Sequence, residues 1–273
     1  MADAIITHDA PGVYFGQRER LSNSGIKELL RCPARFKAMM DGEEEAKETP
    51  ALLLGSLFHA MTLEPESVAG VFARRQNPGN TKAGKEEAAA AAEKGVTLVS
   101  PDMWAQAEAM AESARANPFL AAALKDANFE AETSIYWDQN GVPCKARLDG
   151  IAEIPGFGRC VIDLKSTTDA SPEGIGRHMA DFGYHRQAAW YSHAMAMVER
   201  PVQAFVFVFV EKDAPYVSTA VTVAEDAIGL AHDEIRRALR LYAECTASGV
   251  WPGYTSDIIT TIDLPAYAYR RAE

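Results

Sequence analysis

The chain has 273 residues, of which 48% are hydrophobic and 24% are charged, a composition typical of a globular protein with a substantial core. Its net charge of −11 argues against a protein that coats nucleic acid non-specifically, because neutralising phosphates requires lysine and arginine. The sequence has no run of about 18 uncharged apolar residues and no basic secretory leader, so we expect a cytoplasmic protein without a membrane span.

The first half of the chain is expected to be mainly helical. After a lead over residues 1–20, residues 21–40 carry apolar residues at helical spacing, with Ser22, Asn23 or Ser24 as the candidate N-cap. A compact apolar helix is expected over 51–65, where Pro65 closes it. Residues 74–95 are expected to form a basic, glycine-containing loop followed by an exposed helix, and a further helix is expected over 101–126.

The second half carries the pattern of a β-sheet. Residues 132–138 alternate and are rich in β-formers, and Asn140-Gly141 is a strong hairpin signal before a second strand over 142–154. A third strand over 159–167 completes a three-stranded meander. The remaining expected elements are a helix (183–198), a buried strand (203–212), an edge strand (216–223), a long amphipathic helix (224–249) and an irregular tail (250–273). Together they predict one α/β domain over 1–273, with a helical part over 21–126 and its core over 127–249.

The residues most suggestive of chemistry lie on two neighbouring strands. Asp149 ends one strand, and Asp163 and Lys165 lie two apart on the next, so the last two side chains share a face. Two carboxylates with a backbone carbonyl, here that of Leu164, suit a hard cation such as Mg²⁺. The alternative is a solvated surface Asp/Lys pair. However, these charges interrupt an apolar strand, where an unpaired charge would be costly.

The segment LDGIAEIPGFGRCVIDLKST resembles the motif of PD-(D/E)xK nucleases, in the variant of RecB-type exonucleases. GYHRQAAWY (183–191) is similar to the Q-x-x-x-Y helix of that family, and GSLFHAMTLEP (55–65) to its G-x-x-x-H motif. LSNSGIKELLRCPARF (21–36) resembles its opening helix, and the likeness extends over roughly residues 20–255. Within this superfamily the RecE-like exonucleases (exonuclease VIII) are the most similar group. The resemblance implies a nuclease core with a mixed central sheet flanked by helices and a helical N-terminal region.

The same resemblance implies a role for each matching residue. Asp149 and Asp163 would be metal ligands and Lys165 the catalytic lysine, with His59 as a ligand or neighbour of the metal. Glu132 matches the additional acidic position of the family. Gln187 and Tyr191, one helical turn apart, would position the scissile phosphate or the lysine. The alternatives are a packed histidine at position 59 and, on the later helix, a core tyrosine beside a solvated glutamine.

The resemblance also implies an activity and partners. We expect a Mg²⁺-dependent exonuclease, for which Mn²⁺ would substitute, that degrades linear double-stranded DNA 5′→3′ and leaves 3′ tails. A RecT-like single-strand annealing protein and a homo-oligomeric ring, a trimer or tetramer, would accompany it. A structure-specific or single-strand endonuclease of the same superfamily is the alternative. A non-enzymatic DNA-binding protein would be expected to lack Asp149, Asp163 or Lys165.

Some members of the superfamily carry an iron–sulfur cluster, and this chain departs from their pattern. Its four cysteines are scattered without a C-x-x-C pair, and only Cys245 follows the core strands, so we expect no cluster, no zinc site and no disulfide framework. Cys32 is instead expected to pack between helices.

Several basic side chains are candidates for contacts with a DNA backbone, although most single surface charges are simply solvated. One set follows the chain from the first helix to the basic loop and comprises Arg31, Arg35, Lys37, Arg74, Arg75, Lys82 and Lys85. His178, His185 and Arg186 lie beside the Q-x-x-x-Y helix and are expected to line the same cleft, where His185 and Arg186 are further candidates for DNA contacts. A solvent-facing His185 is the alternative.

Overall fold

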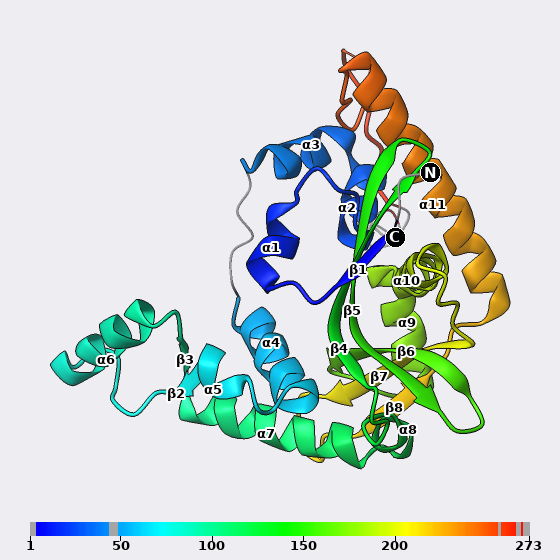
Figure 1. Ribbon diagram of the computed structural model, residues 1–273. Coiled ribbons are helices and arrows are strands. Elements are labelled where there is room, and N and C mark those ends of the chain that lie inside the picture. The colour runs from blue at the N-terminus through cyan, green and yellow to red at the C-terminus, as the bar shows by residue number, and fades with distance from the viewer. Residues whose placement is uncertain (1–3, 44–48, 256–257, 266–268, 270–273) are drawn as a thin grey trace.

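A computed structural model describes residues 4–43, 49–255, 258–265 and 269 of the chain. Its centre is a six-stranded sheet in the order β1-β4-β5-β6-β7-β8 (Figure 1). The strands are β1 Ile5–Thr7, β4 Glu130–Gln139, β5 Val142–Ile154, β6 Gly158–Thr167, β7 Ala204–Glu211 and β8 Ser218–Val221. The pair β6 and β7 is parallel and the other neighbours are antiparallel. The prediction of an α/β fold with a mixed central sheet is therefore confirmed.

The hairpin between β4 and β5 forms where the sequence predicts it. Asn140 and Gly141 have φ angles of 54° and 86°, and two consecutive residues in the left-handed region are what a type I′ turn requires. Asp138 Oδ1 also accepts a hydrogen bond of 2.7 Å from the Gly141 amide. The turn sets the register that continues to the functional end of the sheet, where Thr133 faces Leu148.

Helices cover both faces of the sheet. On one face, Asn23–Arg31 (α2), Pro33–Asp41 (α3), Pro172–Phe182 (α9), Tyr184–Met197 (α10) and Glu225–Ser248 (α11) contribute to one apolar cluster. On the other, Pro50–Leu63 (α4), Val68–Val71 (α5), Pro101–Ala116 (α7) and Pro118–Ala123 (α8) contribute to a second. Strand β6 supplies Val161 to the first cluster and Ile162 and Leu164 to the second. Charged residues on this strand are thus placed between two apolar layers.

A pair of tryptophans anchors α10 to the sheet. The rings of Trp137 and Trp190 lie 4.8 Å apart, both are 2% exposed or less, and Trp190 Nε1 donates a hydrogen bond of 3.0 Å to the Lys145 carbonyl. Trp190→Ala is expected to reduce the free energy of unfolding by about 3–5 kcal/mol, since it leaves a large cavity. Urea unfolding would measure this. Trp104→Ala, at a half-buried position on α7, should cost clearly less, and equal losses would contradict the assignment.

Two long predicted helices are each divided in the structure. The helix expected over 21–40 is interrupted at Cys32, which is extended at φ −166° and ψ 108° and leads into Pro33. The helix expected over 101–126 is divided at Asn117, before Pro118. Proline disfavours the helical conformation of the residue before it, so these two predictions were wrong about continuity. Ser22 is confirmed as the N-cap of α2, because its side chain accepts from the Gly25 amide.

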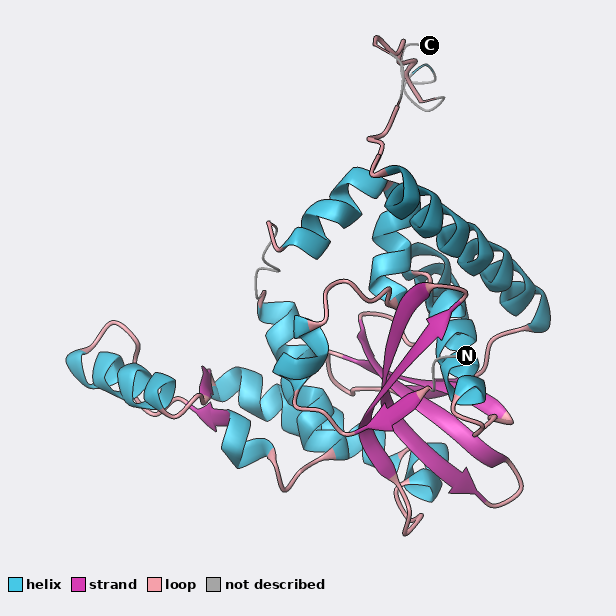
Figure 2. Ribbon diagram, turned by 45° about the horizontal axis from the view of Figure 1, so that its top comes forward, coloured by secondary structure: helices cyan, strands magenta, loops and turns pink. Residues whose placement is uncertain are grey.

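Several short elements were not predicted. They are β1, Pro11–Gly16 (α1), α5, α9, β2 Phe72–Arg74 and β3 Thr97–Val99, of which β2 and β3 pair in parallel. With α6 Lys82–Glu93, these two strands form an arm. Figure 2 shows this arm projecting from the body, with the exposed helix that the sequence does predict at its end. Among the described helices, none is both long and apolar enough to cross a membrane.

Candidate active site

The site begins where two antiparallel strands part. The last registered pair of β5 and β6 towards this end is Gly150 with Ile162. The next residue on each strand is an aspartate, Asp149 and Asp163, so neither has a backbone partner on the other strand. Instead, Asp149 Oδ2 accepts a hydrogen bond of 2.9 Å from the Leu164 amide. The separation of the strands makes room for both carboxyl groups, and the charge of Asp149 acts on Asp163.

A candidate metal centre lies at this point. His59, Glu132 and Asp149 each offer one ligand atom, and these atoms lie within 4.8 Å of one another. His59 Nδ1 is 3.4 Å from Asp149 Oδ2, and its Nε2 is 2.9 Å from the Leu164 carbonyl oxygen. His59 arrives from α4 and Asp149 from the sheet, and Figure 1 shows α4 and α10 on opposite sides of β4 and β5. One imidazole and two carboxylates form a donor set that fits a divalent cation.

Glu132 reaches this centre through an unusual backbone conformation. Its φ is +49°, whereas its neighbours remain in register, Ala131 with Gly150 and Thr133 with Leu148. A left-handed conformation costs a residue other than glycine about 1–3 kcal/mol and persists only where surrounding contacts enforce it. The strain is confined to the residue that brings a second carboxylate to the centre.

Asp163 has different partners from those expected of a metal ligand. It is fully buried and is contacted by Lys165 Nζ and by the Gln187 side-chain amide, which donates to Asp163 Oδ2. Lys165 Nζ also lies 5.2 Å from the centre of the Tyr184 ring and 5.8 Å from that of Phe207. Among the described residues, Asp163 is outside the group that could hold an ion. Its role as a ligand stays a prediction.

The charges of the site perturb one another strongly. Burial raises the pKa of Asp149 and of Asp163 to about 7. A neighbouring carboxylate adds to each rise, Glu132 at Asp149 and Asp149 at Asp163, while the positive charge of Lys165 lowers both pKa values. Burial alone would lower the pKa of Lys165, but the carboxylates of Asp163 and Asp149 raise it above its usual value. Burial, followed by the charge of Lys165, lowers the pKa of His59, which favours the neutral ring that a metal requires.

These shifts predict that cation binding depends on pH. A carboxyl group with a pKa of about 7 holds its proton below that pH, and the proton must leave before a cation binds. The affinity for Mg²⁺ should therefore fall below pH 7, by about tenfold per pH unit for each proton displaced. The Mg²⁺-dependent rise in melting temperature at pH 8 and at pH 5.5 would measure this. Equal rises at the two values would contradict the expectation.

The other expected site residues lie on α10. Gln187 contacts Asp163, as described, and Tyr191 lies one turn later, half-buried, with its ring 6.2 Å from that of Phe205. Burial raises the pKa of the Tyr191 hydroxyl, and Tyr14, Asp163 and Asp149 add to the rise. Tyr191 is thus near the carboxylates, and its role there stays a prediction.

The candidate DNA contacts fall in three environments. Arg31 and Arg35 both pair with Glu28, at 3.7 and 2.6 Å. Lys37 pairs with Asp41 in the same region. On the arm, Arg74, Lys82 and Lys85 are exposed and Arg75 is half-buried, and Lys82 Nζ is 3.8 Å from Glu86 Oε1. His178 Nδ1 is 2.9 Å from Thr167 Oγ1, beside the end of β6.

His185 and Arg186 lie in the third environment, between α10 and α11. They are 8% and 7% exposed and both contact Glu234 on α11, at 3.4 and 2.5 Å. These contacts hold the two helices together, so neither side chain is accessible to a DNA phosphate. The expectation of DNA contacts at these two positions is therefore corrected, because both side chains are buried against Glu234 inside the protein.

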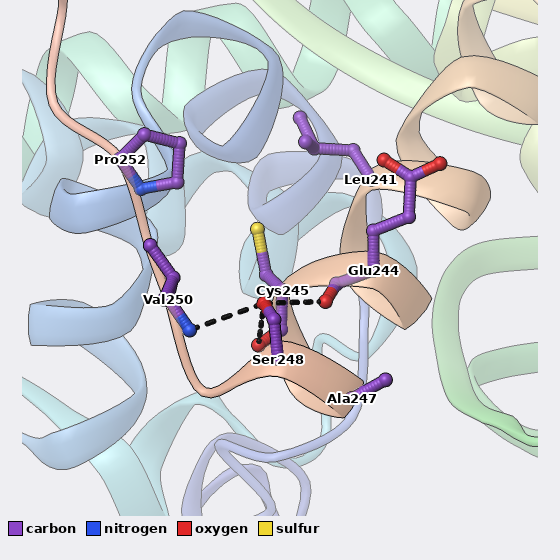
Figure 3. A pocket seen from close by; sticks show the side chains of 7 residues that line it. All are labelled: Leu241, Glu244, Cys245, Ala247, Ser248, Val250 and Pro252. Atoms are coloured by element: carbon purple, nitrogen blue, oxygen red, sulfur yellow. Dashed lines mark hydrogen bonds between the residues drawn. The ribbon is translucent and has the colours of Figure 1, made fainter. Parts of the chain in front are cut away.

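A hollow at the C-terminal end of α11 lies outside the acidic site (Figure 3). Cys245 projects towards Pro252 and Leu241, and Ser248 Oγ donates to the Glu244 carbonyl at 2.8 Å and accepts from the Val250 amide at 3.2 Å. Cys32 is 2% exposed and its Sγ is 4.0 Å from the Pro252 carbonyl oxygen. The contact with Pro252 joins the segment after α11 to the junction of α2 and α3, so Cys32 lies in helix packing.

Two residues that the sequence did not single out contact the site. Tyr184 lies under the Lys165 ammonium, and Arg147 donates a hydrogen bond of 2.7 Å from Nε to Glu132 Oε2. A signal for Arg147 was present, because Lys145, Arg147 and Asp149 alternate with the fully buried Cys144, Ala146 and Leu148. That alternation indicates a strand with one charged face.

The fold and the arrangement of Asp149, Asp163 and Lys165 on neighbouring strands are those of the PD-(D/E)xK nuclease class. Within this class, the chain belongs to the family described as "PDDEXK-like domain of unknown function (DUF3799)", whose model matches residues 22–263. No curated protein sequence matches the chain.

One solved structure shows the same fold. A crystal structure from Eubacterium rectale, described as a "putative exonuclease", is 16% identical, covers 96% of this chain and 98% of its own, and has a TM-score of 0.61. The protein SSO0001 is 15% identical over 74% of this chain and 89% of its own, with a TM-score of 0.31. Protein VC1899 from Vibrio cholerae is 9% identical over 90% of this chain and 58% of its own, with a TM-score of 0.25.

Proposed function

We propose that the protein is a Mg²⁺-dependent exonuclease that degrades linear double-stranded DNA 5′→3′ and leaves 3′ single-stranded tails. The observation that carries the proposal is the joint placement of the His59, Glu132 and Asp149 cluster with Lys165, which Asp163 holds beside it. Phosphodiester hydrolysis needs a site for a hard cation and a fixed positive charge near the phosphate, and both are combined here.

The residues have separate tasks in this reaction. Glu132, Asp149 and His59 would hold the cation, which, when bound, polarises the phosphate and lowers the pKa of a water molecule. Lys165 offers its ammonium to the charge that develops on the phosphate oxygens. Gln187, by donating to Asp163, fixes the carboxylate that holds Lys165, and Tyr184 covers the ammonium from one side. Asp163 and Gln187 therefore act through the lysine.

The finer parts of the proposal come from the resemblance to RecE-like exonucleases. They are the 5′→3′ direction, a role in recombination by annealing with a RecT-like protein, and assembly into a ring of three or four subunits that encloses DNA. Arg74, Arg75, Lys82 and Lys85, on the projecting arm and at the start of its helix, are the basic residues that we propose to contact the DNA backbone. Mn²⁺ would substitute for Mg²⁺, since both accept carboxylate, carbonyl and water oxygens.

Digestion of end-labelled DNA tests the proposal. Linear duplex labelled at the 5′ or the 3′ end is incubated with the protein in Mg²⁺ or in EDTA, beside a covalently closed circle of the same sequence. We expect early release of the 5′ label, loss of linear duplex in Mg²⁺, an intact circle and no reaction in EDTA. Cleavage of the circle would favour a structure-specific or single-strand endonuclease instead. Hydrolysis in EDTA would refute the role of the cation.

A further inference from the structure

Arg147 is held in place on several sides next to the metal centre. Its Nε donates to Glu132 Oε2 at 2.7 Å, and its Nη1 donates to the Asp9 carbonyl at 2.8 Å and to Ser134 Oγ at 3.2 Å. The side chain is 12% exposed. A guanidinium with three acceptors in a fixed plane cannot turn without losing several hydrogen bonds at once. Glu132 therefore meets a donor in a fixed position.

The N-terminal segment provides the support behind Arg147. Strand β1 pairs with β4 from Ile5 with Tyr136 to Thr7 with Ser134, and Asp9 lies two residues after its end. Asp9 Oδ2 accepts from the Tyr136 hydroxyl at 2.6 Å, and its Oδ1 accepts from Thr7 Oγ1 at 3.1 Å. The carbonyl that receives Arg147 is thus tied to the sheet by its own side chain. Hydrogen bonds therefore connect the segment after β1 to Arg147, and Arg147 to Glu132.

Each carboxylate of the cluster has one oxygen that is already engaged. Arg147 Nε binds Glu132 Oε2, and the Leu164 amide binds Asp149 Oδ2. Asp149 Oδ2 also faces His59 Nδ1 at 3.4 Å, whereas Oε1 of Glu132 is the oxygen that a bound cation would take without displacing Arg147. Mg²⁺ requires an octahedral shell of single oxygen contacts, whereas Ca²⁺ takes six to eight oxygens and commonly binds both oxygens of a carboxylate.

We infer that Arg147 is a positioning residue that selects the cation, because it reserves one oxygen of Glu132 and so favours Mg²⁺ over Ca²⁺. The inference rests on the proposed function, since it concerns the same metal centre. It adds a determinant of cation choice outside the ligand set. It also gives the N-terminal segment a role, because the Asp9 carbonyl holds the guanidinium at the required angle.

Calorimetric titration of the DNA-free protein with MgCl₂ and CaCl₂ tests the inference without relying on hydrolysis. In Arg147→Met, the affinity for Ca²⁺ relative to Mg²⁺ should rise about tenfold, the lower range of effects from residues behind metal ligands. Loss of the positive charge strengthens the binding of both divalent cations alike, so the ratio reports the geometry alone. Arg147→Lys keeps the charge but offers no planar fork, and its ratio should rise by about threefold.

The control removes the oxygen that Arg147 is proposed to reserve. In a Glu132→Gln background, Arg147→Met should leave the ratio unchanged, because the amide is a poor bidentate ligand. A wild-type ratio in Arg147→Met, or an equal shift in the Glu132→Gln background, would overturn the inference. If circular dichroism shows that Arg147→Met does not fold, Arg147→Lys decides by the same criterion. A wild-type protein that binds neither cation would instead refute the metal-dependent function and the inference with it.

Discussion

Lys165→Ala is expected to lower the rate of DNA hydrolysis by about a hundredfold to a thousandfold, the usual loss when a preorganised electrostatic group is removed. The ammonium is the cation that Asp163 holds at the site, and no substitute charge follows it on β6 before the strand ends at Thr167. The fold should survive, because Asp163, with a pKa of about 7, can take a proton when its partner is lost. Single-turnover hydrolysis of end-labelled duplex would measure the loss.

The same experiment needs evidence that binding and fold are intact. DNA-end binding in EDTA, followed by gel shift, should remain close to wild type in Lys165→Ala, because the lysine acts on the reacting phosphate. Lys94→Ala, at an exposed position at the end of α6, serves as the matched loss of one lysine and should keep the full rate. A Lys165→Ala protein with ordinary turnover would refute the role assigned to the ammonium.

The centre of the fold could be predicted because its signals are local. Asn140-Gly141 specifies the hairpin, β5 begins and ends at the predicted residues, Val142 and Ile154, and the two-residue spacing of Asp163 and Lys165 gives their common face. The parts that were missed depend on distant contacts. Strand β1 has only three residues, too few for a periodic pattern, and it is defined by pairing with β4 about 130 residues away.

The candidate active site also combines residues that local sequence signals identify with residues that depend on distant contacts. Residues on the meander strands were identified from their spacing, but the backbone of Glu132, at φ +49°, follows from its place opposite Asp149 and could not be read from its neighbours. The contact of Arg147 with Glu132 also requires the strand register. Cys32 and Asn117 are a different case, since the proline after each is a local signal that should have ended the helix.

Asp149→Asn is expected to have opposite effects on hydrolysis and on the stability of the cation-free protein. The amide is a weak ligand, so the loss of several kcal/mol of metal-assisted stabilisation should lower the rate by about a thousandfold. The pKa of Asp149, about 7 in the folded protein, lies above the unfolded value, so its ionisation destabilises the fold as pH rises from about 4 to 7. The uncharged amide removes that penalty.

The predicted gain in stability should therefore depend on pH. Without a cation, the free energy of unfolding of Asp149→Asn should exceed that of wild type by about 1 kcal/mol or more at pH 8, and by little at pH 4, where the wild-type carboxyl is protonated in the folded state and about half protonated in the unfolded state. Saturating Mg²⁺ should reverse the order at pH 8, because only the wild type gains from binding. Asp213→Asn, at an exposed position, should change neither quantity. A variant that is less stable than wild type at pH 8 without cation would show that Asp149 is satisfied by its hydrogen bond to Leu164, and that its charge is not held there for the cation.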